Sequence, residues 1–250
     1  MEITPARLAE TEYHRLIDPQ YLYPSRFGDF YNHAGFRTRH DAHQLCRTIC
    51  QAGQVVDLLQ EIDQLYAGLG LGHKKISGHD LATYHNIEPE LSTRGWQVQR
   101  TWVMLWQKEP IRPANPAIEI RVVDETNLAD LDSLHQGENG QLQPSYLFHR
   151  AQDARVGGER IIAYIDGRPA ASTGWHLLDG VVRYRHVDTQ EWARKQGAAT
   201  TMLHYVQQHP VVQAQDGLTI FCGEDGPISL YEQMGFVKQN FMWEFLLLDE

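Results

Sequence analysis

The chain has 250 residues, a formal net charge of −10 and three cysteines. This length allows one large domain or two ordinary ones, and an acidic chain without a basic stripe argues against a nucleic-acid partner. Because there is no run of 18 apolar residues, no Cys-x-x-Cys pair and no apolar secretion signal, we expect no membrane partner, no metal site and a cytoplasmic location.

The first half contains one strongly periodic segment, residues 54–69, whose apolar side chains recur at helical spacing. A short strand at 74–77, a helix near 90–94 and a long strand at 97–106 are predicted after it. Cys46 and Cys50 lie four positions apart, and we expect them on one helix as buried thiols, since two thiols and a nearby histidine are too few ligands for a metal.

A connector at 108–116 carries three prolines and marks a boundary between a domain at 1–112 and a domain at 117–250. The second domain opens with an alternating strand at 118–123. The acidic and aromatic side chains of the following segment, 128–150, are able to receive an amine, but a solvated face over buried leucines is the favoured interpretation.

Four further strands are predicted in the second domain. Asp166-Gly167 joins strands 160–165 and 168–178 into a hairpin, because this dipeptide suits a tight turn. A second turn leads into the strand 180–187. Residues 218–222 form the next strand.

Between the strand 180–187 and a helix that stops before Pro210 lies the run Arg194-Lys195-Gln196-Gly197-Ala198-Ala199. A helix start leaves backbone N–H groups without partners and carries the positive end of the helix dipole, so a phosphate satisfies both. Small residues allow a pyrophosphate close to the backbone, and two cations add attraction. This segment is therefore predicted to bind a phosphate.

These residues resemble the GNAT superfamily of acyl-CoA-dependent N-acyltransferases. The pyrophosphate motif of that family, Arg/Gln-x-x-Gly-x-Gly/Ala, matches Arg194-x-x-Gly197-x-Ala199. The hairpin, the next strand and the late segment Leu230-Tyr231-x-x-x-Gly235-Phe236 follow in the family's order, so the resemblance covers about residues 118–250.

The resemblance implies acetyl-CoA as the acyl donor, bound where two parallel strands splay apart, and direct transfer to a small-molecule or peptide amine. Tyr231 matches the general acid that protonates the departing thiolate. The backbone of the preceding strand end would hold the pantetheine arm and face the thioester, and the loop amides would hold the pyrophosphate. The cofactor-binding residues so implied are Val187, Asp188, Thr189, Arg194, Lys195, Gln196, Gly197, Ala198, Ala199 and Thr200.

A base for the acceptor amine is less well marked, because the chain has 13 histidines and one near any motif is expected by chance. His186 and Glu224 are our catalytic candidates beside the two strands. His135 and Glu138 are further candidates, and a water chain is an alternative to all of them.

The first half resembles a reduced copy of the second. Gly95-Trp96 and the strand after it match Gly235-Phe236 and its strand at a constant offset of 140 (235 minus 95), but Leu91 stands where the second copy has Tyr231. No phosphate motif opens the helix at 54–69. We therefore expect an α/β protein of two tandem GNAT-like domains, each a mixed, mostly antiparallel twisted sheet flanked by helices, with a degenerate first copy.

The functional hypothesis is an N-acetyltransferase that moves an acetyl group from acetyl-CoA to an amine. The alternative is a non-catalytic CoA-binding or regulatory module, because a fold alone does not establish a function. A homodimer is compatible with the sequence but not indicated by it.

Overall fold

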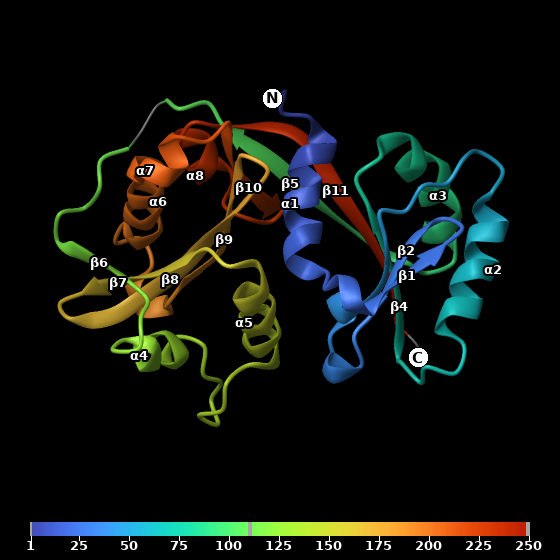
Figure 1. Ribbon diagram of the computed structural model, residues 1–250, viewed down its shortest axis with the longest axis horizontal. Helices are drawn as coiled ribbons and strands as arrows, with labels where there is room; N and C mark the ends of the chain where they lie inside the picture. The colour runs from blue at the N-terminus through green and yellow to red at the C-terminus, as the bar shows by residue number, and fades with distance from the viewer. Residues whose placement is uncertain (1, 110–111, 249–250) are drawn as a thin grey trace. The chain divides into compact units, whose positions relative to one another are not determined.

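The computed structural model describes residues 2–109 and 112–248. It contains two compact units (Figure 1), one built mainly from Val103–Gln239 and one from Thr4–Trp102 together with the chain from Asn240 onward. We call them the 103–239 unit and the 4–102 unit. Among the described residues, no helix is both long enough and apolar enough to cross a membrane.

The sheet of the 4–102 unit has the strand order β1-β2-β3-β4-β11. Strands β1 to β3 pair antiparallel, β3 pairs parallel with β4, and β4 pairs antiparallel with the second part of β11. The elements of this unit are α1 (Pro5–Leu16), β1 (Leu22–Ser25), β2 (Gly28–Asn32), β3 (His43–Cys46), α2 (Val55–Tyr66), β4 (His73–Gly78), α3 (Leu81–Thr93), β5 (Gln97–Trp106) and β11 (Phe236–Leu248).

The core of this unit lies between its sheet and the helices α2 and α3. Helix α2 buries Leu58, Ile62 and Tyr66, which recur at helical spacing as the sequence predicts. The Tyr66 hydroxyl donates to the backbone oxygen of His43 at 2.7 Å, which ties the helix to β3. Trp243 of β11 is 1% exposed and lies opposite Gly78 of β4, so the glycine leaves room for the indole ring.

The helix predicted around the two cysteines is wrong. Cys46 ends strand β3, all four of whose residues are buried, and Cys50 lies in the following loop. A four-residue strand buried on both faces has no period-2 pattern, so the i, i+4 spacing of the cysteines was uninformative. Both thiols are buried, and burial raises the pKa of Cys46 to about 12. No group of three or more metal-ligating side chains occurs within the described ranges.

The sheet of the 103–239 unit has the strand order β5-β10-β9-β8-β7-β6. Strands β6 to β9 form an antiparallel meander, and β10 pairs parallel with β9. Figure 1 shows α6 on one face of β7–β9 and α4 and α5 on the other. The elements are β6 (Ile118–Val122), α4 (Leu128–Ser133), α5 (Pro144–Val156), β7 (Glu159–Ile165), β8 (Arg168–Leu178), β9 (Val181–Thr189), α6 (Ala198–Gln208), α7 (Pro210–Gln213), β10 (Gly217–Gly223) and α8 (Ile228–Gln233).

The compact units do not coincide with the segments 1–112 and 117–250 expected from the sequence. Residues from Asn240 onward fall in the 4–102 unit, since β11 pairs with β4 from Trp243 opposite Gly78 to Leu248 opposite His73. The division into units follows from strand pairing between β11 and β4. The position of a proline-rich connector in the sequence does not indicate that pairing. Residues 110 and 111 of that connector lie outside the described ranges.

The repeat at an offset of 140 is visible in the backbone. Helix α3 ends at Thr93 and helix α8 at Gln233 (233 minus 93 is 140). Gly95 and Gly235, two residues later, both adopt left-handed conformations with φ of 81° and 83°. A glycine in this conformation ends each helix and starts each long strand.

Candidate active site

A gap opens between the parallel strands β9 and β10. Their pairing runs from Val181 opposite Gly217 to Tyr184 opposite Ile220 and stops there. Beyond this point the strands line a cavity of about 190 Å³ that also reaches Pro227 and Tyr231. Backbone groups at the ends of both strands therefore face a cavity and do not face each other.

A bulge in β9 lies beside this gap. From Ser172 to Gly174 strand β8 advances two positions, while the opposing strand β9 moves three, from Asp188 to Arg185. Over this stretch β9 therefore has one residue more than β8, and His186 adopts a left-handed backbone with φ of 52°. Such strain at a non-glycine residue is concentrated at functional sites.

Residues 194–200, which the sequence predicts to bind a phosphate and which we call the phosphate loop, lead from β9 into α6 through a glycine turn. After the 3-10 helix Glu191–Ala193, Lys195 (φ 63°) and Gly197 (φ 91°) turn the chain into α6. Gly197 is the N-cap, and no side chain among the described residues caps this helix. The first N–H groups of α6 are thus available to an anion, which suits a pyrophosphate.

The connector before β6 holds this loop from outside. Asn115 donates its side-chain amide to the backbone oxygen of Gln196 at 3.1 Å, and its backbone N–H donates to the Thr201 hydroxyl at 3.0 Å. The backbone oxygen of Arg112 lies 2.9 Å from Nδ1 of His204 on the same helix. Residues 112–115 therefore brace both the loop and the first turns of α6.

A cavity of about 710 Å³ joins the loop, the end of β9 and helix α8. Its lining includes three cations and one carboxylate, namely Arg112, Arg194, Lys195 and Asp188, so it favours an anionic ligand. Nine of the ten cofactor residues implied by the sequence line it, together with Tyr231. The complete lining is Arg112, Val187, Asp188, Thr189, Ala193, Arg194, Lys195, Gly197, Ala198, Ala199, Thr200, Pro227, Leu230 and Tyr231.

Tyr231 lies on α8 and lines both this cavity and the smaller one between the strands. It is 6% exposed, and its ring meets the Phe236 ring edge-on at 6.2 Å. Burial raises the pKa of its phenol above the ordinary value, the nearby Cys222 adds to this, and Arg183 opposes it. The hydroxyl therefore keeps its proton at neutral pH.

A third cavity, of about 320 Å³, lies on the α5 side of β9 and shares Asp188 and Thr189 with the largest one. Leu134, His135, Tyr146, His149 and Arg160 contribute to it. The segment 128–150 forms one wall of this cavity and also buries Leu131 and Leu134, two leucines of the favoured interpretation. Its role in receiving an amine stays a prediction.

The remaining sequence candidates lie in different places. His186 lines the third cavity and the gap between the strands. Glu224 is exposed in the turn after β10 and lines none of the cavities described above. The Gln196 side chain turns back to donate to the Trp192 backbone oxygen at 2.8 Å.

Three residues that line or support the cavities, Arg112, Asn115 and Arg160, were not singled out by any sequence pattern. Arg112 and Asn115 lie in the connector, more than 80 residues before the loop that they support, as the separation of 81 between Asn115 and Gln196 shows. Arg160 and Tyr146 come from two elements that meet only in the fold. No local spacing relates such residues to the motif.

Comparison with known proteins places the fold. No family model and no curated protein matches the chain. A functionally unknown conserved protein from Staphylococcus epidermidis is similar in structure, with a TM-score of 0.71, 14% identity, and 94% of this chain and 96% of that one covered. A GCN5-related N-acetyltransferase from Kribbella flavida has a TM-score of 0.66, 14% identity, and coverage of 98% and 95%. A tandem GNAT protein from the clavulanic acid biosynthesis pathway has a TM-score of 0.59, 11% identity, and coverage of 97% and 87%.

These likenesses extend over nearly the whole chain, both units included. The chain therefore has the fold of the GNAT superfamily, in its tandem form.

Proposed function

We propose that this protein is an acyltransferase that binds acetyl-CoA and transfers its acetyl group directly to an amine. The observation that carries the proposal is the cavity of about 710 Å³, in which an uncapped helix N-terminus, three cations and a buried tyrosine line one continuous space. In this proposal segment 117–250 holds the cofactor, and segment 1–112 is a copy that has lost its cofactor site.

The residues have five roles under this proposal. The amides of Arg194 to Thr200 hold the pyrophosphate, and the backbone of Val187, Asp188 and Thr189 holds the pantetheine arm. A backbone N–H at the bulged end of β9 stabilises the oxyanion that forms on the thioester carbonyl. Tyr231 gives its proton to the thiolate that leaves. His186 and Glu224 stay candidate bases, and the contacts of His186 with two cavities favour it over Glu224.

Calorimetric titration with acetyl-CoA tests the proposal, with Gly197→Glu as the comparison. Gly197 has a φ of 91° and its Cβ position has ordinary space, so a glutamate there brings a negative charge to the phosphate site. We expect micromolar binding that the variant loses. Gly167→Glu, in the β7–β8 turn with no atom near its Cβ position, is the control for a charge at a left-handed glycine.

The alternative, a CoA-binding module without catalysis, makes a different prediction. It retains binding of acetyl-CoA but releases no free CoA with any amine. Absence of binding by the unmodified protein contradicts both the acyltransferase and the CoA-binding module, and it favours a non-catalytic regulatory module that keeps the fold.

A further inference from the structure

The cavity of about 320 Å³ adjoins the proposed donor site through Asp188 and Thr189. A molecule bound in it lies next to the strand end where the acetyl group is proposed to sit. Its volume fits a small acceptor. Two of its lining residues, His135 and Arg160, present polar atoms to it: a ring nitrogen that can accept a proton and a guanidinium that can bind a carboxylate.

His135 is held rigidly in the wall. The residue is 6% exposed, and its ring stacks on Tyr146 at 4.2 Å with an interplanar angle of 9°. Tyr146 is itself fixed by donating to the Asp132 carboxylate at 2.6 Å. The backbone oxygen of His135 accepts from the N–H of Gln143 at 3.0 Å. The imidazole therefore has one orientation.

That orientation gives the two ring nitrogens different roles. Nε2 lies 3.1 Å from the hydroxyl of the buried Ser172, and Nδ1 lies 3.8 Å from Oδ2 of Asp188. In the tautomer that donates from Nε2 to Ser172, Nδ1 carries a lone pair. A separation of 3.8 Å is too long for a direct hydrogen bond, but one amine nitrogen fits within hydrogen-bonding distance of both atoms.

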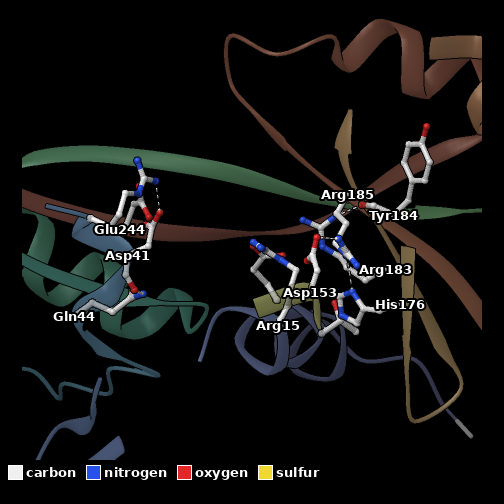
Figure 2. Close-up of polar contacts among 12 residues, drawn as sticks. Arg15, Asp41, Gln44, Asp153, His176, Arg183, Tyr184, Arg185 and Glu244 are labelled. Atoms are coloured by element: carbon white, nitrogen blue, oxygen red, sulfur yellow. Dashed lines mark hydrogen bonds and ion pairs between the residues drawn. The ribbon is translucent and has the colours of Figure 1, made fainter. Parts of the chain in front are cut away.

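Arg160 presents an unfilled guanidinium to the same cavity. Its Nε and Nη1 atoms are buried and have no hydrogen-bond partner among the described residues. The nearest carboxylate, Asp153, is 3.6 Å away and already forms a closer ion pair of 2.5 Å with Arg185, which Figure 2 shows beside it. The hydrogens of Nη1 and Nη2 at the end of a guanidinium point in parallel directions, so this end of Arg160 matches a carboxylate with two parallel hydrogen bonds.

We propose that this cavity is the acceptor site for a small amine that also carries a carboxylate, with Arg160 binding the carboxylate and His135 accepting the amine proton. The inference rests on the proposed function. Asp188 attracts the ammonium form, and Arg160 holds the other end of the molecule.

His135 and Tyr231 move the protons in the transfer step. The bound ammonium first loses one proton to solvent. The neutral amine then attacks the acetyl carbon, the C–N bond forms and the C–S bond breaks. The proton of the amine goes to Nδ1 of His135. The thiolate that leaves takes the proton of Tyr231.

The charges around His135 set its protonation. Burial lowers its pKa, Asp188 opposes this, Arg160 adds to the lowering and Asp132 again opposes it. Tyr146, His149 and His186 are the other titratable groups lining the cavity. The net lowering leaves the imidazole neutral at pH 7, which is the form that accepts a proton.

The first experiment compares amino acids with their decarboxylated amines, using release of free CoA. We expect kcat/KM to favour the carboxylate-bearing member by roughly tenfold to a hundredfold, through KM, since hydrogen bonds to charged groups have this strength. Arg160→Gln abolishes the preference and Arg160→Lys restores part of it. Arg168→Gln, at the exposed start of β8, is the control. Equal turnover of both members of each pair by the unmodified protein overturns the proposal.

The second experiment concerns His135. His135→Gln lowers kcat by roughly a hundredfold or more and removes the acidic limb of the pH–rate profile. Calorimetry on the protein loaded with acetyl-CoA shows amino-acid binding unchanged in this variant and lost in Arg160→Gln. His85→Gln, at an exposed histidine of α3, is the control. His186→Gln tests the competing base, and a loss of activity there with none in His135→Gln overturns the role given to His135.

Binding of acetyl-CoA distinguishes a failure of the proposed function from a failure of the acceptor assignment. If acetyl-CoA does not bind, the proposed function falls and this inference with it. If acetyl-CoA binds and only amines without a carboxylate are acetylated, this inference alone is wrong.

Discussion

Leu91 and Tyr231 occupy equivalent positions in two copies of the same helix–turn–strand segment. Their backbone oxygens accept from Arg94 at 3.1 Å and from Met234 at 3.0 Å, at the same step of each helix end. Leu91 is fully buried in the apolar core of the 4–102 unit, whereas Tyr231 lines two cavities. One copy thus has a packed leucine where the other has the tyrosine that we propose as the proton donor.

Replacing Tyr231 by phenylalanine removes only a hydroxyl. We expect kcat to fall by about tenfold to a hundredfold, because the departing thiolate loses its positioned acid. The Kd of acetyl-CoA stays within about twofold, since the ring packing is kept. Steady-state release of CoA and calorimetry measure both. Tyr205→Phe on α6, which lines none of the described cavities, is the control, and an undiminished kcat in Tyr231→Phe removes this residue as the acid.

Asn115→Ala frees the phosphate loop from its brace. The variant loses the hydrogen bond to the Gln196 backbone oxygen, so we expect a loss of about 1 kcal/mol in unfolding free energy and a several-fold weaker affinity for acetyl-CoA. Urea denaturation and calorimetry test these effects. Asn139→Ala, in an exposed turn, serves for comparison. Identical affinities in the two variants would show that the brace does not position the loop.

Gly78→Ala is expected to destabilise the 4–102 unit. A Cβ at this position overlaps the six-membered ring of Trp243, whose indole N–H donates to the Asp80 backbone oxygen at 3.0 Å and so resists displacement. Overpacking of this kind costs about 1–3 kcal/mol. Adding Trp243→Phe recovers part of that loss. Gly72→Ala meets no atom within 4 Å and is the control for urea denaturation.

Because of its buried histidines, we expect the unfolding free energy of the 4–102 unit to decrease as the pH falls. Burial lowers the pKa of His73 to about 4, and the neighbouring His40 and His43 add to this. Because the unfolded pKa is near 6.5, the unfolded chain binds the proton more readily between these values. Stability is therefore full above about pH 6.5 and is lost as pH falls toward 4.

His73→Phe is the matching substitution. It should reduce the acid-induced loss of unfolding free energy by about 3 kcal/mol, which corresponds to 2.5 pKa units. Thermal unfolding recorded from pH 7 to pH 4 measures the slope. His85→Gln changes an exposed histidine and keeps the slope of the unmodified protein. An equal slope in His73→Phe would assign the acid sensitivity to other groups.

The elements around the phosphate loop were predictable because local rules fix them. The turn Asp166-Gly167 has φ values of 52° and 75°, as a tight hairpin requires, and the helix opened by Gly197 stops at Gln208 before Pro210. Helix α3 was predicted only over its last turn. It starts at Leu81, capped by Asp80, and continues through Pro89.

The rest of the site depends on contacts between distant residues. Asn115 supports Gln196 across 81 positions, and His135 meets Ser172 across 37. The sequence named His135 among its candidate bases but had no means to rank it. Its stacking on Tyr146 and its approach to Asp188 arise only when β7, β8 and β9 are paired.

The extra residue in β9 has a consequence for sequence alignment. Asp188 pairs with Ser172 and Arg185 with Gly174, so Arg185 and Asp188 face the same side of the sheet although they are three positions apart. If side chains are assigned to alternate faces along the whole of β9, every residue after His186 is assigned to the wrong face. An alignment with a distant homologue whose strand has no bulge needs a one-residue gap at 186–187, and without that gap it matches Asp188 and Thr189 to residues of the wrong side.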